Sequence, residues 1–178
     1  MPKPYFKDNN KIKEILMVNH AGEFGAQRIY QGQLAFTKNH NDISTIQHML
    51  EQELEHLNYF ENEIKNSQSK PTFLLPLWSV LGYVLGALSA IAGAKTSMLV
   101  TESVEEVIVK HYQEQIEYLE NSGNQSPLLI KIKQFKQEEA EHIEIAIKND
   151  SKNAALHSTL SKMLKTMCNM AIYLSKKI

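Results

Sequence analysis

Apolar and polar residues follow no sustained two-residue alternation along this chain of 178 residues, so the pattern does not predict strands. Proline and glycine, which a helix interior tolerates least, leave long stretches untouched. Glycine is absent from residues 33 to 81 and from 94 to 122, and proline occurs at five positions. The pattern predicts an all-α protein with five long helices, expected over Asn9–Lys38, Ile43–Lys65, Lys95–Glu120, Leu128–Asn149 and Asn153–Lys176.

Residues with known capping preferences indicate where these helices begin and end. After a break at Asn39–Asn41, Asp42 is expected to cap the second helix. The turn Asn121–Pro127, with the sequence NSGNQSP, carries Gly123, which is suited to end a helix. The proline that closes the turn is suited to the first turn of the next helix.

Two segments are more apolar than the rest. Between Lys70 and Lys95 lie 24 residues without a charge, which is long enough to cross a membrane. The last helix is amphipathic and is expected to dock on an apolar surface through one stripe. This stripe consists of Leu156, Leu160, Met163, Leu164, Met167, Met170, Ala171 and Leu174.

The chain contains an internal repeat of a helical hairpin. A shift of 82 residues lays the first predicted helix on the third and pairs Glu23, Tyr30, Gln31 and Gln33 with Glu105, Tyr112, Gln113 and Gln115. A shift of 86 residues lays the second on the fourth and pairs Glu53, Glu55 and His56 with Glu139, Glu141 and His142. Each copy therefore presents one glutamate and then a Glu-x-x-His motif.

Helix geometry decides which of these side chains can meet. Residues three apart lie about 60° apart around the axis, so each Glu-x-x-His pair can reach one centre. Two such pairs and one glutamate from each of two other helices form the ligand set of di-iron carboxylate proteins. The sequence thus predicts six metal ligands: Glu23, Glu53, His56, Glu105, Glu139 and His142. Glu55 and Glu141 point about 100° away, towards solvent or behind the ligands.

The roles of two tyrosines and one histidine near the predicted ligands each allow two interpretations. Tyr30 and Tyr112 lie seven residues after a predicted ligand, so they either pack in the core or place a phenol near the metal. His20 either supports the ligands or stands at a helix start. The histidines outside any motif are expected at the surface or in loops: His40, His48 and His157.

Composition narrows the classes of function. With 19 Lys and Arg against 20 Asp and Glu, the net charge of -1 provides no basic surface, so no nucleic-acid partner is expected. The single cysteine, Cys168, excludes an internal disulfide and a cysteine-built metal site. Met1–Asn10 has no signal-peptide pattern, and the length fits one domain over residues 1–178.

The same residues carry a family resemblance. It rests on VNHAGEFGAQRIYQGQ (18–33), QELEH (52–56), PLWSVLGYVLGA (76–87), VEEVIVKHY (104–112), EEAEH (138–142) and AIYLS (171–175). With these motifs the chain resembles the demethoxyubiquinone hydroxylase family of ubiquinone biosynthesis. The resemblance implies a ferritin-like four-helix bundle with two Fe ions bridged by Glu53 and Glu139. It also implies that His111 and Tyr112 act beside the ligands and towards the substrate.

The resemblance implies a function as well. The expected reaction hydroxylates the ring of a demethoxyubiquinol, a polyprenyl methoxy-methyl-benzoquinol, with O2 and two electrons. The alternative is a ferritin-like iron-oxidising or peroxide-removing protein, which uses similar ligands without an organic substrate. The apolar segment favours the hydroxylase, because a soluble ferritin-like protein has no need of it. The family also implies a lipid-binding assembly partner, whereas a homo-oligomer stays open.

A single membrane span through the apolar segment conflicts with the predicted metal site. Half of the ligands precede the segment and half follow it, so one span would place them on opposite sides of the bilayer. A bundle with one long crossover removes the conflict, and residues 72–94 are expected to form that crossover helix, about 22 residues long.

The excess apolar surface then predicts binding in the membrane interface without spanning it, helped by Trp78 and Tyr83. We expect a peripheral membrane protein at the cytoplasmic face of a bacterial cell membrane. Small residues recur every four positions in the segment, and they serve either close helix packing or a groove for a polyprenyl tail. They are Gly82, Gly86, Ala90 and Ala94.

Overall fold

The computed structural model describes residues 9–123 and 126–177, which form helices joined by turns and irregular segments and contain no strand. The elements are α1 (Asn9–Phe36), α2 (His40–Asn66), α3 (Leu75–Ala92), α4 (Ala94–Asn121), α5 (Pro127–Lys148), the 3-10 helix η1 (Ser151–Asn153) and α6 (His157–Ser175). The all-α prediction is confirmed. Parts of the predicted amino-terminal segment and of the NSGNQSP turn, at residues 1–8 and 124–125, lie outside the described residues.

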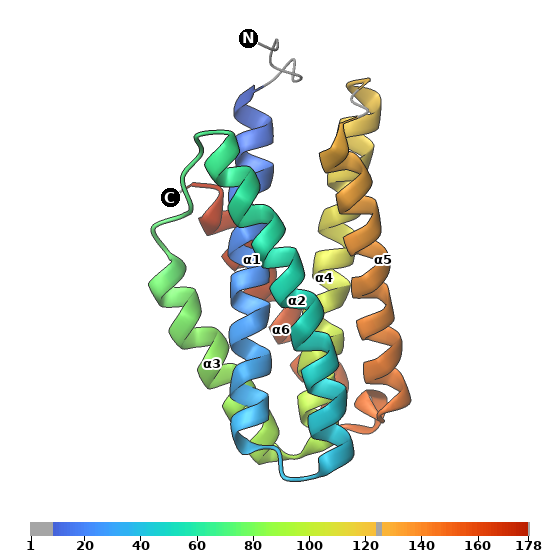
Figure 1. Cartoon of the computed structure of the whole chain (residues 1–178). Helices are drawn as coiled ribbons and strands as arrows, with labels where there is room; N and C mark the ends of the chain where they lie inside the picture. The colour runs from blue at the N-terminus through green and yellow to red at the C-terminus, as the bar shows by residue number, and fades with distance from the viewer. Residues whose placement is uncertain (1–8, 124–125, 178) are drawn as a thin grey trace.

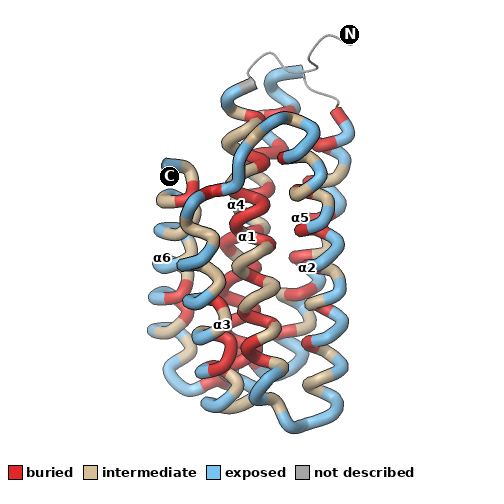
Figure 2. The backbone as a smooth tube through the Cα atoms, turned by 60° about the vertical axis from the view of Figure 1, so that its left-hand side comes forward, coloured by how far each residue is buried: buried red, intermediate tan, exposed pale blue. Residues whose placement is uncertain are grey.

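Two helical hairpins make up a four-helix bundle, as the internal repeat predicts. α1 and α2 form one hairpin and α4 and α5 the other. The crossover from the end of α2 to the start of α4 consists of an irregular segment, residues 67–74, followed by α3 (Figure 1). Buried residues line the inner faces of α1 and α4 (Figure 2). α3 covers α1 and α6 packs mainly on α4, so the two additional helices lie outside the bundle. This is the ferritin-like arrangement with an apolar crossover.

The crossover helix touches α1 backbone to backbone. A Cβ atom built on Gly86 would lie 1.9 Å from the carbonyl oxygen of Ile29, and one on Gly32 would lie 2.2 Å from that of Tyr83. Only glycine permits this separation. The small-residue stripe therefore serves helix packing at Gly82 and Gly86. Its other two members, Ala90 and Ala94, line a cavity of about 440 Å³ beside the α1–α2 turn.

Two predicted helix boundaries are wrong. Asn39, not Asp42, caps α2, because the Asn39 Oδ1 atom accepts hydrogen bonds from the backbone N–H groups of Asn41 (2.8 Å) and Asp42 (3.3 Å). The crossover helix has 18 residues rather than about 22. It ends at Gly93, whose φ of 116° lies outside the range that L-residues favour, and α4 starts directly afterwards.

The last helix also starts later than predicted. Asp150 and Leu156 have positive φ angles of 67° and 56°. The 3-10 helix η1 and a turn over residues 154–156 therefore precede α6, which begins at His157 rather than at Asn153. Apolar residues occupy more than half of the positions in this helix, so they cannot all face the core. The prediction that the whole stripe docks on an apolar surface is therefore wrong in part. Leu160 and Leu164 pack on the core, while the methionines of the stripe face outward and are exposed: Met163, Met167 and Met170.

We expect Gly86→Ala to lower the free energy of unfolding by about 1–3 kcal/mol, because the added methyl group has no room against the α1 backbone. Thermal unfolding followed by circular dichroism measures this. Gly25→Ala is the matched control in α1: its Cβ meets nothing within 4 Å, so this variant should be about 1 kcal/mol more stable. A Gly86→Ala protein as stable as the parent would contradict the close contact.

Candidate metal centre

The six predicted ligands converge inside the bundle from four different helices. α1 supplies Glu23, α4 supplies Glu105, and α2 and α5 each supply a Glu-x-x-His pair. None of the six side chains is more than 3% exposed. Burying an ionised carboxylate costs several kcal/mol unless a counter-charge is present, so four buried carboxylates require cations or protons.

These side chains form two metal-sized groups that share two members. Ligand atoms of Glu23, Glu53, His56 and Glu139 lie within 4.8 Å of one another. The same holds for Glu53, Glu105, Glu139 and His142. Glu53 and Glu139 belong to both groups, which is the arrangement that bridging carboxylates require. We refer to these groups as the His56 position and the His142 position.

Both histidine rings turn the same nitrogen towards the carboxylates. His56 Nδ1 lies 3.1 Å from Glu139 Oε1 and 3.4 Å from Glu23 Oε2. His142 Nδ1 lies 2.9 Å from Glu139 Oε2 and 3.4 Å from Glu53 Oε1. The two oxygens of Glu139 therefore face one imidazole each, so this carboxylate stands between the two positions.

The two tyrosines with open interpretations lie against the ligands. Tyr30 Oη donates a hydrogen bond to Glu105 Oε1 at 2.8 Å, and Tyr112 Oη donates to Glu23 Oε1. Burial, reinforced by these carboxylates, raises the pKa of both phenols well above the ordinary value of 10. Both tyrosines are thus neutral donors that hold a ligand carboxylate, and both are also buried in the core.

Electrostatics and unmet hydrogen bonds show that the cluster suits a cation. Burial and the neighbouring Glu139 raise the pKa of Glu105 to about 8, and the same two causes raise the pKa of Glu53. Both Glu53 oxygens and Glu105 Oε2 lack a hydrogen-bond partner. Buried carboxylate oxygens with imidazole nitrogens are ligands that iron accepts, so the residues fit the predicted metal.

Two residues that the sequence analysis missed contact the outer nitrogens of the histidine rings. His56 Nε2 lies 2.6 Å from Glu138 Oε2, and His142 Nε2 lies 2.9 Å from Gln52 Oε1. These residues immediately precede the ligands Glu139 and Glu53, and they correspond to each other in the internal repeat at the same shift of 86 residues. That correspondence was the signal in the sequence that could have identified them.

Nearly the whole chain matches one known protein family. The model of the family described as ubiquinone biosynthesis protein COQ7 covers residues 10–175. The chain belongs to the COQ7 family. This confirms the resemblance that the motifs indicated.

Relatives in this family carry consistent names. A Dictyostelium discoideum protein named NADPH-dependent 3-demethoxyubiquinone 3-hydroxylase, mitochondrial, is 40% identical over 168 residues, covering 94% of this chain and 77% of the relative. The human protein of the same name is 40% identical over 169 residues, covering 94% and 78%. The Rhodospirillum rubrum 3-demethoxyubiquinol 3-hydroxylase is 38% identical over 168 residues, with the same coverage.

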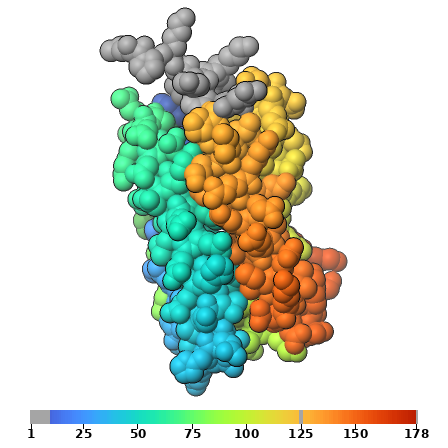
Figure 3. Space-filling model, turned by 45° about the vertical axis from the view of Figure 1, so that its right-hand side comes forward, coloured from blue at the N-terminus to red at the C-terminus, as the bar shows by residue number. Residues whose placement is uncertain are grey.

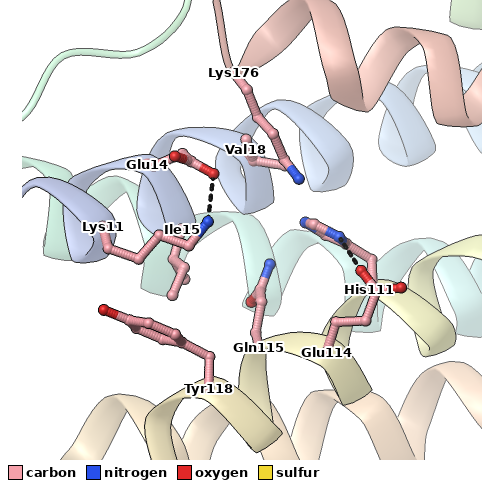
Figure 4. A pocket seen from close by; sticks show the side chains of 9 residues that line it. All are labelled: Lys11, Glu14, Ile15, Val18, His111, Glu114, Gln115, Tyr118 and Lys176. Atoms are coloured by element: carbon pink, nitrogen blue, oxygen red, sulfur yellow. Dashed lines mark hydrogen bonds and ion pairs between the residues drawn. The ribbon is translucent and has the colours of Figure 1, made fainter. Parts of the chain in front are cut away.

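His111, which the family resemblance links to the site, points away from the metal ligands. It faces a cavity of about 70 Å³ between α1, α4 and the end of α6, beside Glu114 and Lys176 (Figure 4). Burial and the nearby Lys176 lower the pKa of His111 to about 4. Within the described ranges, no hydrogen bond or ion pair joins it to the six ligands. Its role therefore stays a prediction, and only the adjacent Tyr112 contacts a ligand.

The structure also places the histidines and glutamates that lie outside the set of six ligands. His20 is buried in the middle of α1, so the helix-start interpretation is wrong. Glu55 and Glu141 face solvent, as do His40 and His48, which confirms these predictions. His157 is the first residue of α6, partly exposed, with Nε2 3.4 Å from Glu102 Oε2.

We expect the metal-free protein to lose stability as the pH rises from 7 to 9. Folded Glu105, with a pKa of about 8, gives up its proton in this range, whereas the unfolded chain has already done so. This residue alone should lower the free energy of unfolding by about 1 kcal/mol. His56, whose pKa hydrogen bonds to Glu139 and Glu23 raise to about 12 against the effect of burial, acts in the same direction.

Urea unfolding at the two pH values in the presence of a chelator measures this effect. Glu105→Gln cannot ionise and should show a smaller change with pH. Stability that is constant or increases over this range would contradict the charge balance described for the cluster.

Proposed function

We propose that this chain is a di-iron monooxygenase that hydroxylates the ring of a demethoxyubiquinol. The observation that carries the proposal is the pair of buried metal-sized groups sharing Glu53 and Glu139, in a chain of the COQ7 family. The names of the relatives from Dictyostelium discoideum, humans and Rhodospirillum rubrum support the same reaction. In this proposal Glu53 and Glu139, which belong to both groups, would hold both iron ions, and each of the other four ligands would hold one.

The reaction replaces one ring C–H bond of the quinol by C–OH. One oxygen atom of O2 enters the ring, and the other leaves as water with two protons and two electrons from a reductant. Two reduced iron ions at this site would supply the electrons that activate O2.

The protein's own residues hold the site in place and keep water out. Tyr30 and Tyr112 each fix one ligand carboxylate by a hydrogen bond, so Glu105 and Glu23 keep their orientation when charge at the site changes. α2 and α5 lie side by side over the face seen in Figure 3, and their side chains meet at His56 and Glu138. The aromatic side chain of Phe135 lies against the His56 ring, with centroids 4.0 Å apart, and adds to this cover.

A membrane-facing surface supports a lipid-soluble substrate. α3 is the helix of the described residues that is long and apolar enough to cross a membrane, yet it lies along α1 and both its ends join the bundle. Its outer side chains Val80, Leu88 and Ile91 are 61%, 60% and 63% exposed. We propose that this face and the exposed methionines of α6 rest in the membrane interface, where a polyprenyl quinol resides. The cytoplasmic side of the membrane and a lipid-binding partner stay predictions.

We expect the reduced, iron-loaded protein to convert a short-tailed demethoxyubiquinol under 18O2 to a product one oxygen heavier, with the label in the ring. Glu53→Gln should reduce the rate at least about 100-fold, because it removes one bridging charge. Glu55→Gln, two positions along α2 and exposed to solvent, is the matched control and should keep the rate. Iron oxidation without labelled product would instead favour the ferritin-like alternative.

We expect the protein to float with vesicles of phosphatidylethanolamine and phosphatidylglycerol. The triple variant Val80→Ser, Val84→Ser and Leu88→Ser should reduce the fraction bound to vesicles at least tenfold. Each of the three changes removes about 1 kcal/mol of the free energy of transfer into the membrane. Ile130→Ser, on the exposed side of α5, is the control and should bind as the parent does. Binding unaffected by the triple change would contradict the membrane role of α3.

A further inference from the structure

The two hairpins contribute to the metal centre in the same geometry. The tyrosine of each hairpin donates to the ligand glutamate of the other, Tyr30 to Glu105 and Tyr112 to Glu23. Likewise, each histidine ring directs Nδ1 to the carboxylates and Nε2 to a residue of the other hairpin. The centre is therefore close to two-fold symmetric in its contacts.

At the outer nitrogens of the histidine rings, the chemistry of the equivalent partners breaks this symmetry. His56 Nε2 meets the carboxylate of Glu138, whereas His142 Nε2 meets the amide oxygen of Gln52. The contact to the carboxylate is shorter, 2.6 Å against 2.9 Å. The other oxygen of Glu138 accepts a hydrogen bond from Gln134 Nε2 at 2.9 Å, so this carboxylate is held at both oxygens. One histidine thus has an anionic partner and the other a neutral one.

The charge of this partner matters to a metal on the far side of the ring. When a metal occupies Nδ1, the ring carries its proton on Nε2 and donates it to the outer residue. A carboxylate accepts this hydrogen bond more strongly than an amide and makes the imidazole a more basic ligand. A contact that only joined α2 to α5 would not need this charge, because Gln52 joins the same helices with a neutral side chain.

We propose that Glu138 makes the two metal positions unequal, so that the His56 position binds a divalent ion more tightly and fills before the His142 position. This inference rests on the proposed di-iron function. Glu138 is a positioning residue, since it acts through His56 and does not itself belong to either group of ligands.

Stepwise binding of Co²⁺ to the metal-free full-length chain tests the proposal. Titration followed by calorimetry and visible absorption should resolve two steps of different affinity. In Glu138→Gln, the tighter step should weaken by about 10–100-fold and approach the second step. Proton NMR at one equivalent of Co²⁺ should show a shifted ring N–H signal that the Glu138→Gln change moves, because the first ion occupies the His56 position.

Variants at Gln52, the residue equivalent to Glu138, test the other metal position in the same way. Gln52→Glu should tighten the weaker step and leave the first unchanged. The double exchange Gln52→Glu with Glu138→Gln should again give two separated steps, with the His142 position now filling first. Glu141→Gln removes the same charge from a solvent-facing position on α5 and should change neither step by more than about twofold.

The outcomes separate this inference from the function on which it rests. Two Co²⁺ ions that bind to Glu138→Gln with the affinities of the parent would overturn the inequality and leave the two-metal centre intact. A parent protein that is folded by circular dichroism and binds no Co²⁺ would overturn the centre itself. Circular dichroism and thermal unfolding of each variant exclude misfolding as the cause of a weaker step.

Discussion

Mutual repulsion among four buried carboxylates is the constraint around which the structure is organised. Glu23, Glu53, Glu105 and Glu139 are all buried in two groups that share Glu53 and Glu139, where water cannot screen their charges. Two imidazoles, two phenols and the cations that the proposed centre would bind must together compensate these charges. Because all six ligands lie within long helices, rigid and internally hydrogen-bonded backbone holds the cluster together in place of loops.

The internal repeat provides this compensation because each hairpin supplies polar groups that contact the ligands of the other. The phenol of one hairpin holds the carboxylate of the other, and the outer residue of one hairpin holds the histidine of the other. Neither α1–α2 nor α4–α5 therefore completes its own half of the site. This explains why a long crossover connects the hairpins. They associate in opposite directions, with the α1–α2 turn beside the start of α4, so the segment containing α3 must carry the chain from the end of α2 back along the bundle before α4 begins.

Periodicity and helix geometry were sufficient to predict the helices and the converging ligands, because a helix fixes the direction of every side chain relative to its neighbours. They were insufficient where an interaction depends on another element. Asn39 and Asp42 are both residue types that cap helices, and composition alone does not show which of the two begins α2. The outward direction of Met163 and the contact of Glu138 with His56 depend on how α6 and α2 pack, and no single-helix pattern contains that information.

The contact between α3 and α1 couples the surface of the protein mechanically to its interior. At Gly86 the α1 backbone occupies the space in which a layer of side chains would normally lie, and such a layer is what allows two helices to slide. Tyr30 directly follows Ile29, whose carbonyl makes this contact, and Glu23 lies six residues earlier in the same helix. The exposed apolar face of α3 and one side of the metal cluster therefore form a single rigid body, so a displacement imposed on the outer helix is transmitted to the ligands.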